Sequence, residues 1–204
     1  FKNMIIKEDN NEHPVVIGIT GASGSSLAES LIDRLLNLSI PVIAIASSPA
    51  RMVWQSEMTE SFGATIERWS SSPYFKMHSN GDFLAPISSG TFPTRGMAIV
   101  PCSMATAAAI STGLSDNLIR RSADVCLKER RPLVLVPRES PLTAIHLENM
   151  AKLAHLGAVI LPPEPAFYLH PKSIEEVIDF VSERALYALG ITNALPEDLQ
   201  YNPK

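Results

Sequence analysis

The stretch VVIGITGASGSSLAE, residues 15–29, decides the fold, because an apolar run passes through closely spaced small residues into a helical pattern. The small residues that matter are Gly21, Ser23 and Gly24. A strand that turns into a helix at such residues surrounds a phosphate with backbone N–H groups. The spacing of these glycines with Gly18 departs from GxGxxG, so a turn required only by tight packing stays open as an alternative.

Four further apolar runs follow along the chain, and none of them alternates between apolar and polar residues. Such runs are typical of strands covered on both faces of a parallel sheet. The five predicted strands span residues 14–20, 41–47, 96–102, 132–138 and 157–163.

Helical patterns lie between these runs. One apolar stripe spans residues 24–38, and another spans 142–156 after Ser140 as N-cap and Pro141 at the first helical position. A third helix opens with a predicted capping box of Ser173 and Glu176. In the second and third helices we expect these residues to face inward: Leu142, Ile145, Leu153, Leu156, Ile174, Val177, Ile178, Val181 and Ala185. The alternation predicts a doubly wound α/β sandwich.

Residues 60–95 interrupt this alternation, since they are rich in Ser, Gly and Pro and suggest at most a short strand near Phe75. We expect a long excursion that carries part of a site or a subunit contact. The 204 residues, 46% of them hydrophobic, suit one domain spanning 1–204, with 1–13 and 192–204 as peripheral tails.

Composition narrows the function classes. The net charge is −4 and no basic block is present, which argues against nucleic acid as a partner. No apolar run approaches the roughly 20 residues that cross a bilayer, and the polar start does not resemble a signal peptide, so we expect a cytoplasmic protein without a membrane partner.

Cys102 and Cys126 lie in apolar stretches outside any CxxC pair, which predicts neither a disulfide nor a zinc site. The histidines lack metal-ligand spacing, so no metal is expected, and His146 is expected to hydrogen-bond neighbours on a helix face.

Polar residues follow the predicted strands, where ligands of open α/β sheets bind. A dinucleotide site needs an acidic residue near the end of the second strand, but Ser47, Ser48 and Pro49 stand there. The sequence therefore favours a mononucleotide whose phosphate lies among hydroxyl groups and helix N-termini.

Four cations suggest a second phosphate. On a helical wheel, Arg121 and Lys128 lie at the edge of one buried stripe, and Arg184 has the same place on another. Each could extend past the core edge to water. Together with Arg138 they are better explained by an anionic ligand, since partly desolvated cations need a partner and Arg suits phosphate.

Two acids are candidates for chemistry. Glu57 lies on a helix predicted to start at Ser48, one turn after Val53, and is expected to face inward as either a structural partner or an acid or base. Glu139 follows Arg138 at a strand end, which favours a functional role.

Several stretches resemble the UbiX-type flavin prenyltransferases, and the resemblance extends from about Val15 to Ile191. They are GITGASGS, ISSGTF, VPCSMATAAAISTG, RRSADVCLKERRPLVLVPRESPL, IHLENMAKLAHLGAVILPPEPAFY and VIDFVSERALYALGI. The resemblance implies a flavodoxin-like, Rossmann-like fold and a homododecamer with active sites between subunits. It also implies a metal-independent transfer of the dimethylallyl group of dimethylallyl monophosphate to N5 and C6 of reduced FMN. The product, prenylated FMN, would serve UbiD-type decarboxylases.

The resemblance also implies roles for individual residues. Ser23 and Glu57 would handle protons near flavin N5, and Lys128, Glu139 and Arg121 would assist phosphate departure and proton return. Residues implied to bind FMN are Gly21, Ala22, Ser23, Ser47, Ser103, Met104, Ala105, Thr106 and Arg138. Residues implied to bind the donor are Ser89, Gly90, Tyr168 and Arg184.

Two alternatives stay open. FMN-dependent cysteine decarboxylases share the fold, but they resemble a pattern with a His after the second strand and a PxMNxxMW motif, and SSPARMVWQSEM has neither. A non-catalytic flavin carrier would need the FMN loops without the second set of cations. The C-terminal tail lacks the Trp that covers the site in some family members, and Tyr201 is a candidate substitute.

Overall fold

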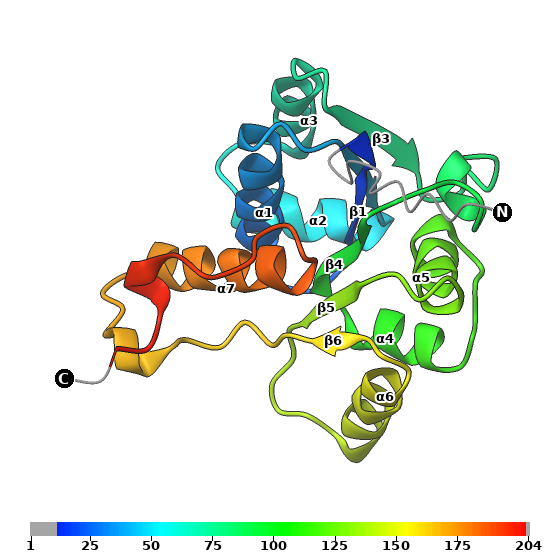
Figure 1. The fold of residues 1–204 in the computed structure, drawn as a ribbon. Helices are drawn as coiled ribbons and strands as arrows, with labels where there is room; N and C mark the ends of the chain where they lie inside the picture. The colour runs from blue at the N-terminus through cyan, green and yellow to red at the C-terminus, as the bar shows by residue number, and fades with distance from the viewer. Residues whose placement is uncertain (1–11, 203–204) are drawn as a thin grey trace, which may run out of the picture.

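The computed structural model describes residues 12–202 and contains one six-stranded sheet in the order β3-β2-β1-β4-β5-β6, with parallel pairing throughout (Figure 1). The strands are β1 (Val15–Ile19), β2 (Val42–Ala46), β3 (Phe75–Ser79), β4 (Gly96–Cys102), β5 (Leu133–Pro137) and β6 (Val159–Ile160). The five predicted strands are confirmed, although β6 is much shorter than its apolar run. The predicted α/β class with a parallel sheet between helices is also confirmed.

Helices cover both faces of the sheet (Figure 1). They are α1 (Ser25–Asn37), α2 (Ser48–Glu57), α3 (Phe62–Ser70), α4 (Met104–Ser111), α5 (Leu118–Lys128), α6 (Ala144–His155) and α7 (Ile174–Ala188). One core cluster joins α1, α2, α3 and α7 to the sheet, and the other joins α4, α5 and α6 to its opposite face. Val15 and Ile17 belong to the first cluster and Val16 to the second, which explains the continuous apolar run of β1.

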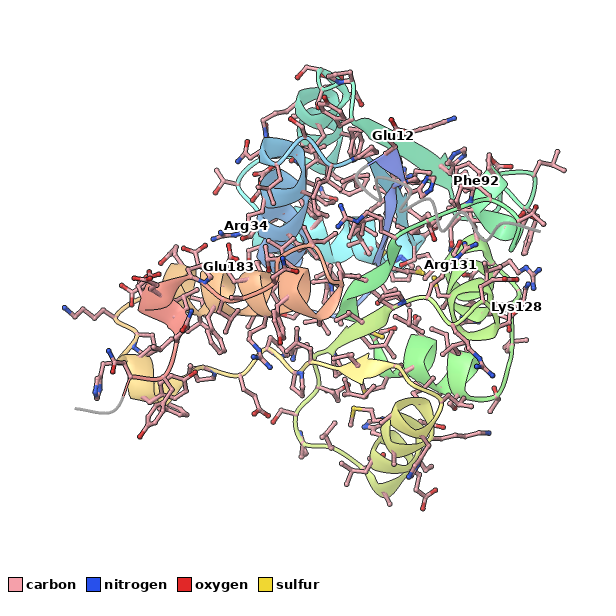
Figure 2. The ribbon with its side chains drawn as sticks, viewed as in Figure 1. Glu12, Arg34, Phe92, Lys128, Arg131 and Glu183 are labelled. Carbon is pink, nitrogen blue, oxygen red and sulfur yellow. The ribbon has the colours of Figure 1, made fainter. Side chains whose placement is uncertain are left out.

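Two ion pairs connect α1 to α7. Arg34 donates from Nη1 to Glu183 at 2.5 Å and from Nη2 to Asp179 at 2.6 Å (Figure 2). The C-terminal segment packs beside the same part of α7 and leaves a cavity of about 490 Å³, which none of the predicted site residues lines. Of the tails expected outside the core, residues 1–11 lie outside the described residues, and 192–202 contain the short 3₁₀ helix η4 (Glu197–Leu199).

Residues 60–95 hold more structure than predicted. The short strand near Phe75 is confirmed as β3, but the absence of a helix was a wrong prediction, since α3 begins after Ser61, whose hydroxyl accepts from the Ala64 N–H. Trp69 of α3 is buried and packs edge-on against Trp54, with ring centroids 5.9 Å apart. This helix was missed because few large apolar anchors hold it among polar and small residues.

The predictions for α6 need two corrections. Its N-cap is Thr143, not Ser140, because Thr143 accepts from the His146 N–H while His146 Nδ1 accepts from the Thr143 N–H. This confirms the expected local hydrogen bonding of His146. Only Leu153 of the expected inward face is buried, whereas Leu142, Ile145 and Leu156 are exposed.

The start of α7 also differs in detail. Ser173 accepts from the Glu176 N–H as predicted, but the Glu176 carboxylate accepts from the Lys172 N–H, so the capping is only partly reciprocal. Ile174 is exposed and was wrongly expected to face inward, while Val181 and Ala185 are buried as predicted. Val177 and Ile178 are partly buried against the core.

The two cysteines are free and buried. Burial raises the pKa of the Cys102 thiol to about 12, and it does the same for Cys126.

Because the thiolate is the reactive form, we expect both cysteines to resist a thiol reagent in the native protein at pH 8 and to react fully in denaturant. Absorbance of a released chromophore would measure this. Rapid labelling of the native protein would contradict the buried positions.

Candidate functional site

Two adjoining pockets lie where β1, β2, β4 and β5 end, and both include Gly21 and Ser103. We name the first, of about 290 Å³, the carboxylate pocket. It is lined by Gly21, Ala22, Ser23, Val53, Ser56, Glu57, Ser103, Met104, Arg138 and Glu139. We name the second, of about 400 Å³, the N-cap pocket. It is lined by Thr20, Gly21, Ser47, Ser48, Pro49, Asn80, Ser103, Ala105, Thr106, Asn117, Ile119 and Arg120. All nine residues predicted to bind the cofactor line one or both pockets.

The N-cap pocket is surrounded by the N-termini of α2, α4 and α5. Their caps are Ser47, which accepts from the Ala50 N–H, Ser103, which accepts from the Thr106 N–H, and Asn117, which accepts from the Arg120 N–H. Other N–H groups in the first turn of a helix have no partner within the helix, and the helix dipole is positive there. The pocket is therefore suited to an anion such as a phosphate.

The end of β1 is tied to the end of β4 beside both pockets. The buried Thr20 hydroxyl donates to the Pro101 carbonyl at 2.8 Å and accepts from the Ser103 N–H at 2.8 Å. The next turn is tightly packed, since a Cβ on Gly21 would overlap Pro49 at the start of α2. These contacts fix the spacing between the first loop and the N-terminus of α4.

The carboxylate of Glu57 caps α1 from the end of α2. The α1 N-cap, Gly24, has a φ of 118° and no side chain to accept a hydrogen bond. Glu57 Oε2 instead accepts from the N–H groups of Gly24 and Ser25, both at 2.9 Å. Glu57 as a whole is exposed, so its predicted inward orientation was wrong, yet its carboxylate still lines the pocket.

These contacts also determine the charge of Glu57. Burial is the largest single influence on its pKa and raises it, but hydrogen bonds from the Ser23 hydroxyl, the Ser25 and Gly24 amides and the Ser25 hydroxyl together lower the pKa below its ordinary value. Glu57 is therefore a carboxylate at neutral pH and accepts a hydrogen bond from the Ser23 hydroxyl. The reading of Glu57 as a structural partner of α1 is confirmed, and its role as an acid or base stays a prediction.

Arg138 and Glu139 form the opposite wall of the carboxylate pocket. They directly follow β5, and the Arg138 N–H donates to the Cys102 carbonyl at 3.3 Å. Glu139 accepts from the Ser140 N–H at 3.0 Å, and both side chains belong to exposed residues. Ser23, Glu57 and Glu139, three of the five predicted catalytic residues, thus line one pocket.

The other two predicted catalytic residues lie elsewhere in the chain. Arg121 donates from Nε to the Ser88 carbonyl at 2.9 Å, and Lys128 pairs with Glu129 beside Gly90. Helix α5 starts at the N-cap pocket, and its 11 residues carry Lys128 about 16 Å away. Figure 2 shows Lys128 and Arg131 at this far end. Within a single chain, Arg121 and Lys128 line neither the carboxylate pocket nor the N-cap pocket.

A third group lies around α7. Tyr168, in the 3₁₀ helix η3 (Phe167–Leu169), packs edge-on against Tyr201 with ring centroids 5.5 Å apart. The Arg184 guanidinium lies over the Tyr187 ring, 5.9 Å from its centroid. Neither Tyr168 nor Arg184 lines the carboxylate or N-cap pocket. The predicted donor-binding residues are thus distributed over two regions separate from the pockets.

The sequence missed several pocket residues. Thr20 belongs to the polar residues that the strand-end rule marks after the first predicted strand, but no binding role was predicted for it. Asn80, Asn117 and Arg120 reach the pocket through a loop and a helix start that the sequence did not mark as site elements. Among residues 12–202, no cluster of three or more His, Cys, Asp or Glu could hold a metal, and none of the helices is long and apolar enough to cross a membrane.

Comparison with known sequences gives consistent matches. A family model described as Flavoprotein matches residues 4–186. The flavin prenyltransferase UbiX of Pseudomonas aeruginosa is 42% identical over 200 residues, covering 91% of this chain and 91% of the relative. That of Chlamydia trachomatis is 45% identical over 181 residues, covering 88% of this chain and 94% of the relative.

Comparison with solved structures finds the same family as the sequence comparison. AnUbiX in complex with FMN and dimethylallyl pyrophosphate has a TM-score of 0.85 and 39% identity, over 95% of this chain and 98% of that chain. A dodecameric FMN-dependent UbiX-like decarboxylase from Escherichia coli O157:H7 has a TM-score of 0.81 and 39% identity, over 87% and 94%. A PPC decarboxylase, with 16% identity and a TM-score of 0.56, shares only the fold.

Replacing Glu57 by Gln tests the capping of α1. The lowered pKa means that the carboxylate stabilises the fold above about pH 4.5 and that this contribution disappears as pH falls through the folded-state pKa. We expect Glu57→Gln to cost about 1 kcal/mol at pH 7, as loss of a helix cap does, and to cost progressively less as the pH falls below about 4.5. Thermal unfolding across this range measures the difference. Glu67→Gln, at an exposed position of α3, is the control, and a pH-independent difference for Glu57→Gln would contradict the assignment.

Proposed function

Because the chain belongs to the flavoprotein family of UbiX flavin prenyltransferases, we propose that it joins the dimethylallyl group of dimethylallyl monophosphate to N5 and C6 of reduced FMN. The product is prenylated FMN, which UbiD-type decarboxylases use. One observation carries the proposal at the level of residues. All nine positions expected to hold FMN line two adjoining pockets, and one pocket adds the Ser23–Glu57 pair.

The pockets fit the two ends of FMN. Unpaired N–H groups at the N-termini of α2 and α4 suit its phosphate, so we assign the phosphate to the N-cap pocket. The flavin ring then belongs in the carboxylate pocket, between Ser23 and Arg138. Reduced FMN supplies the nucleophilic N5 and C6 atoms, and the protein supplies position and proton transfer.

Proton transfer follows from the charges in the carboxylate pocket. Glu57 is ionised and holds the Ser23 hydroxyl, so Ser23 can pass a proton between the flavin edge and Glu57. Glu139 lines the same pocket and is placed to accept the proton that closure of the C6 bond releases. Departure of phosphate from the donor develops negative charge, which Arg121, Lys128 and Arg184 would stabilise, with the Tyr168 hydroxyl as a hydrogen-bond donor.

A complete site requires more than one copy of the chain. The donor-binding residues lie in regions that a single chain keeps apart from the pockets, and a neighbouring copy can bring them together. The side chains of Leu142, Ile145 and Leu156 are exposed around α6 and provide apolar surface for such contacts. We therefore propose a homododecamer for this protein, because the similar Escherichia coli decarboxylase is dodecameric. The cytoplasmic location stays a prediction from the sequence.

The central experiment is an anaerobic reaction of the purified protein with reduced FMN and dimethylallyl monophosphate. Mass spectrometry is expected to find a flavin heavier by one prenyl unit, and a parallel reaction with the pyrophosphate tests the donor. Unmodified flavin in a folded, FMN-bound protein would contradict the proposal and favour a carrier or a decarboxylase.

Two variants test the assigned roles in that reaction. Glu139→Ala and Lys128→Ala are expected to slow turnover about 10²–10⁴-fold, the usual range for acid–base groups, while FMN still binds. Lys76→Ala, at an exposed position of β3, is the control. Unchanged turnover in either of the first two variants would remove that residue from the mechanism.

The assembly can be tested at α6. Ile145→Asp places a charge on an apolar side chain that is 67% exposed in the single chain, so it is expected to reduce the molar mass in solution without unfolding the protein. Light scattering after size exclusion gives the mass, and circular dichroism gives the fold. Ala64→Asp adds the same charge to α3 as a control. A wild-type mass for Ile145→Asp would exclude this surface from the assembly.

A further inference from the structure

Arg120 lies at the N-cap pocket, and neither the strand-end pattern nor the family resemblance marks it. It occupies the first turn of α5, where its N–H donates to the cap residue Asn117. Its side chain is 19% exposed and lines the pocket. Of the described residues that line the pocket, Arg120 alone is charged.

The guanidinium of Arg120 is only partly satisfied by the chain. Nη1 donates to both carboxylate oxygens of Asp116, at 2.7 and 2.9 Å. Nε is buried and has no hydrogen-bond partner among the described residues. A ligand cannot reach this enclosed N–H, but Nη2 also makes no hydrogen bond to a described residue and is not enclosed, so it is the donor left free at the pocket.

The partner Asp116 does not remove the positive charge from the pocket. Asp116 is 52% exposed and lines a neighbouring hollow with Arg51, not the N-cap pocket. Its contact uses only one of the three guanidinium nitrogens, so the two-nitrogen fork of an Arg–oxyanion pair remains unformed. Arg120 thus extends between Asp116 on one side and the pocket on the other.

The remaining pocket groups select the class of ligand. The N-termini of α2 and α4 add partial positive charge and free N–H groups beside hydroxyl side chains. A cation together with such N–H groups fits a phosphate monoester better than a neutral polar group.

We infer that Arg120 binds the phosphate of FMN and makes this protein select the phosphorylated flavin over riboflavin. The inference rests on the proposed function, because it takes FMN as the ligand. The phosphate accepts from the free Nη2, while Asp116 holds Nη1.

The test compares FMN with riboflavin by fluorescence titration of wild type, Arg120→Gln and Arg120→Lys. Loss of one charge-assisted contact is expected to weaken FMN binding about tenfold in Arg120→Gln and to leave riboflavin binding unchanged. Arg120→Lys keeps the positive charge but not the forked guanidinium, so its affinity for FMN is expected to lie between those of wild type and Arg120→Gln. Unchanged riboflavin binding also shows that the variant is folded.

Arg51→Gln is the matched control, since it removes an exposed cation from the neighbouring hollow. Equal losses of FMN affinity in Arg51→Gln and Arg120→Gln would overturn the inference. The positive electrostatic potential of the region, and not a contact from Arg120, would then explain the loss. An equal loss for FMN and riboflavin would overturn it too. Unchanged FMN binding with a raised KM for dimethylallyl monophosphate would assign Arg120 to the donor and overturn the inference. If wild type bound no flavin, the proposed function itself would fail together with the inference.

Discussion

The hydrogen bonds from the Gly24 and Ser25 N–H groups to the Glu57 carboxylate hold the candidate site together. Helix α1 begins at a left-handed glycine and cannot cap itself, so a residue from the end of α2 performs that role. The same carboxylate holds the Ser23 hydroxyl. Helix capping and the proposed proton transfer therefore depend on one group, so the position of the first loop is coupled to the ionisation of Glu57.

Charge is distributed unevenly over the chain. Around the N-cap pocket, helix N-termini and Arg120 provide positive potential without an internal acid, whereas Lys128 is paired with Glu129 and Arg121 with Asp124. An ion pair at an exposed site is weak, so these pairs can exchange their partner for a ligand phosphate at small cost. The single chain thus carries a pocket suited to a phosphate together with separate cations that we propose to contact a second phosphate after assembly.

Much of the fold was predictable because strands that are buried on both faces of the sheet consist almost entirely of apolar residues, a pattern that the sequence shows directly. The runs at 15–19, 42–46 and 96–102 are apolar throughout, and the structure places them at the centre of the sheet. Helix α3 was not predictable by the same rule, since a short helix at the edge needs only a few anchors such as Trp69. For α6, the helical pattern was correct, but periodicity alone could not distinguish an apolar face that meets the core from one left for another copy.

The sequence by itself determined the parallel α/β fold, and the family resemblance named the nine residues that line the two pockets. These residues meet because strand ends of a parallel sheet converge at one edge. Only the tertiary structure decided which groups meet. Glu57 reaches Gly24 across 33 residues, and Arg120 enters the N-cap pocket through the start of α5. Lys128 lies at the far end of that helix although it is near Arg120 in sequence. The reason is geometric, since local patterns specify each element, whereas the packing of elements sets the distances between their side chains.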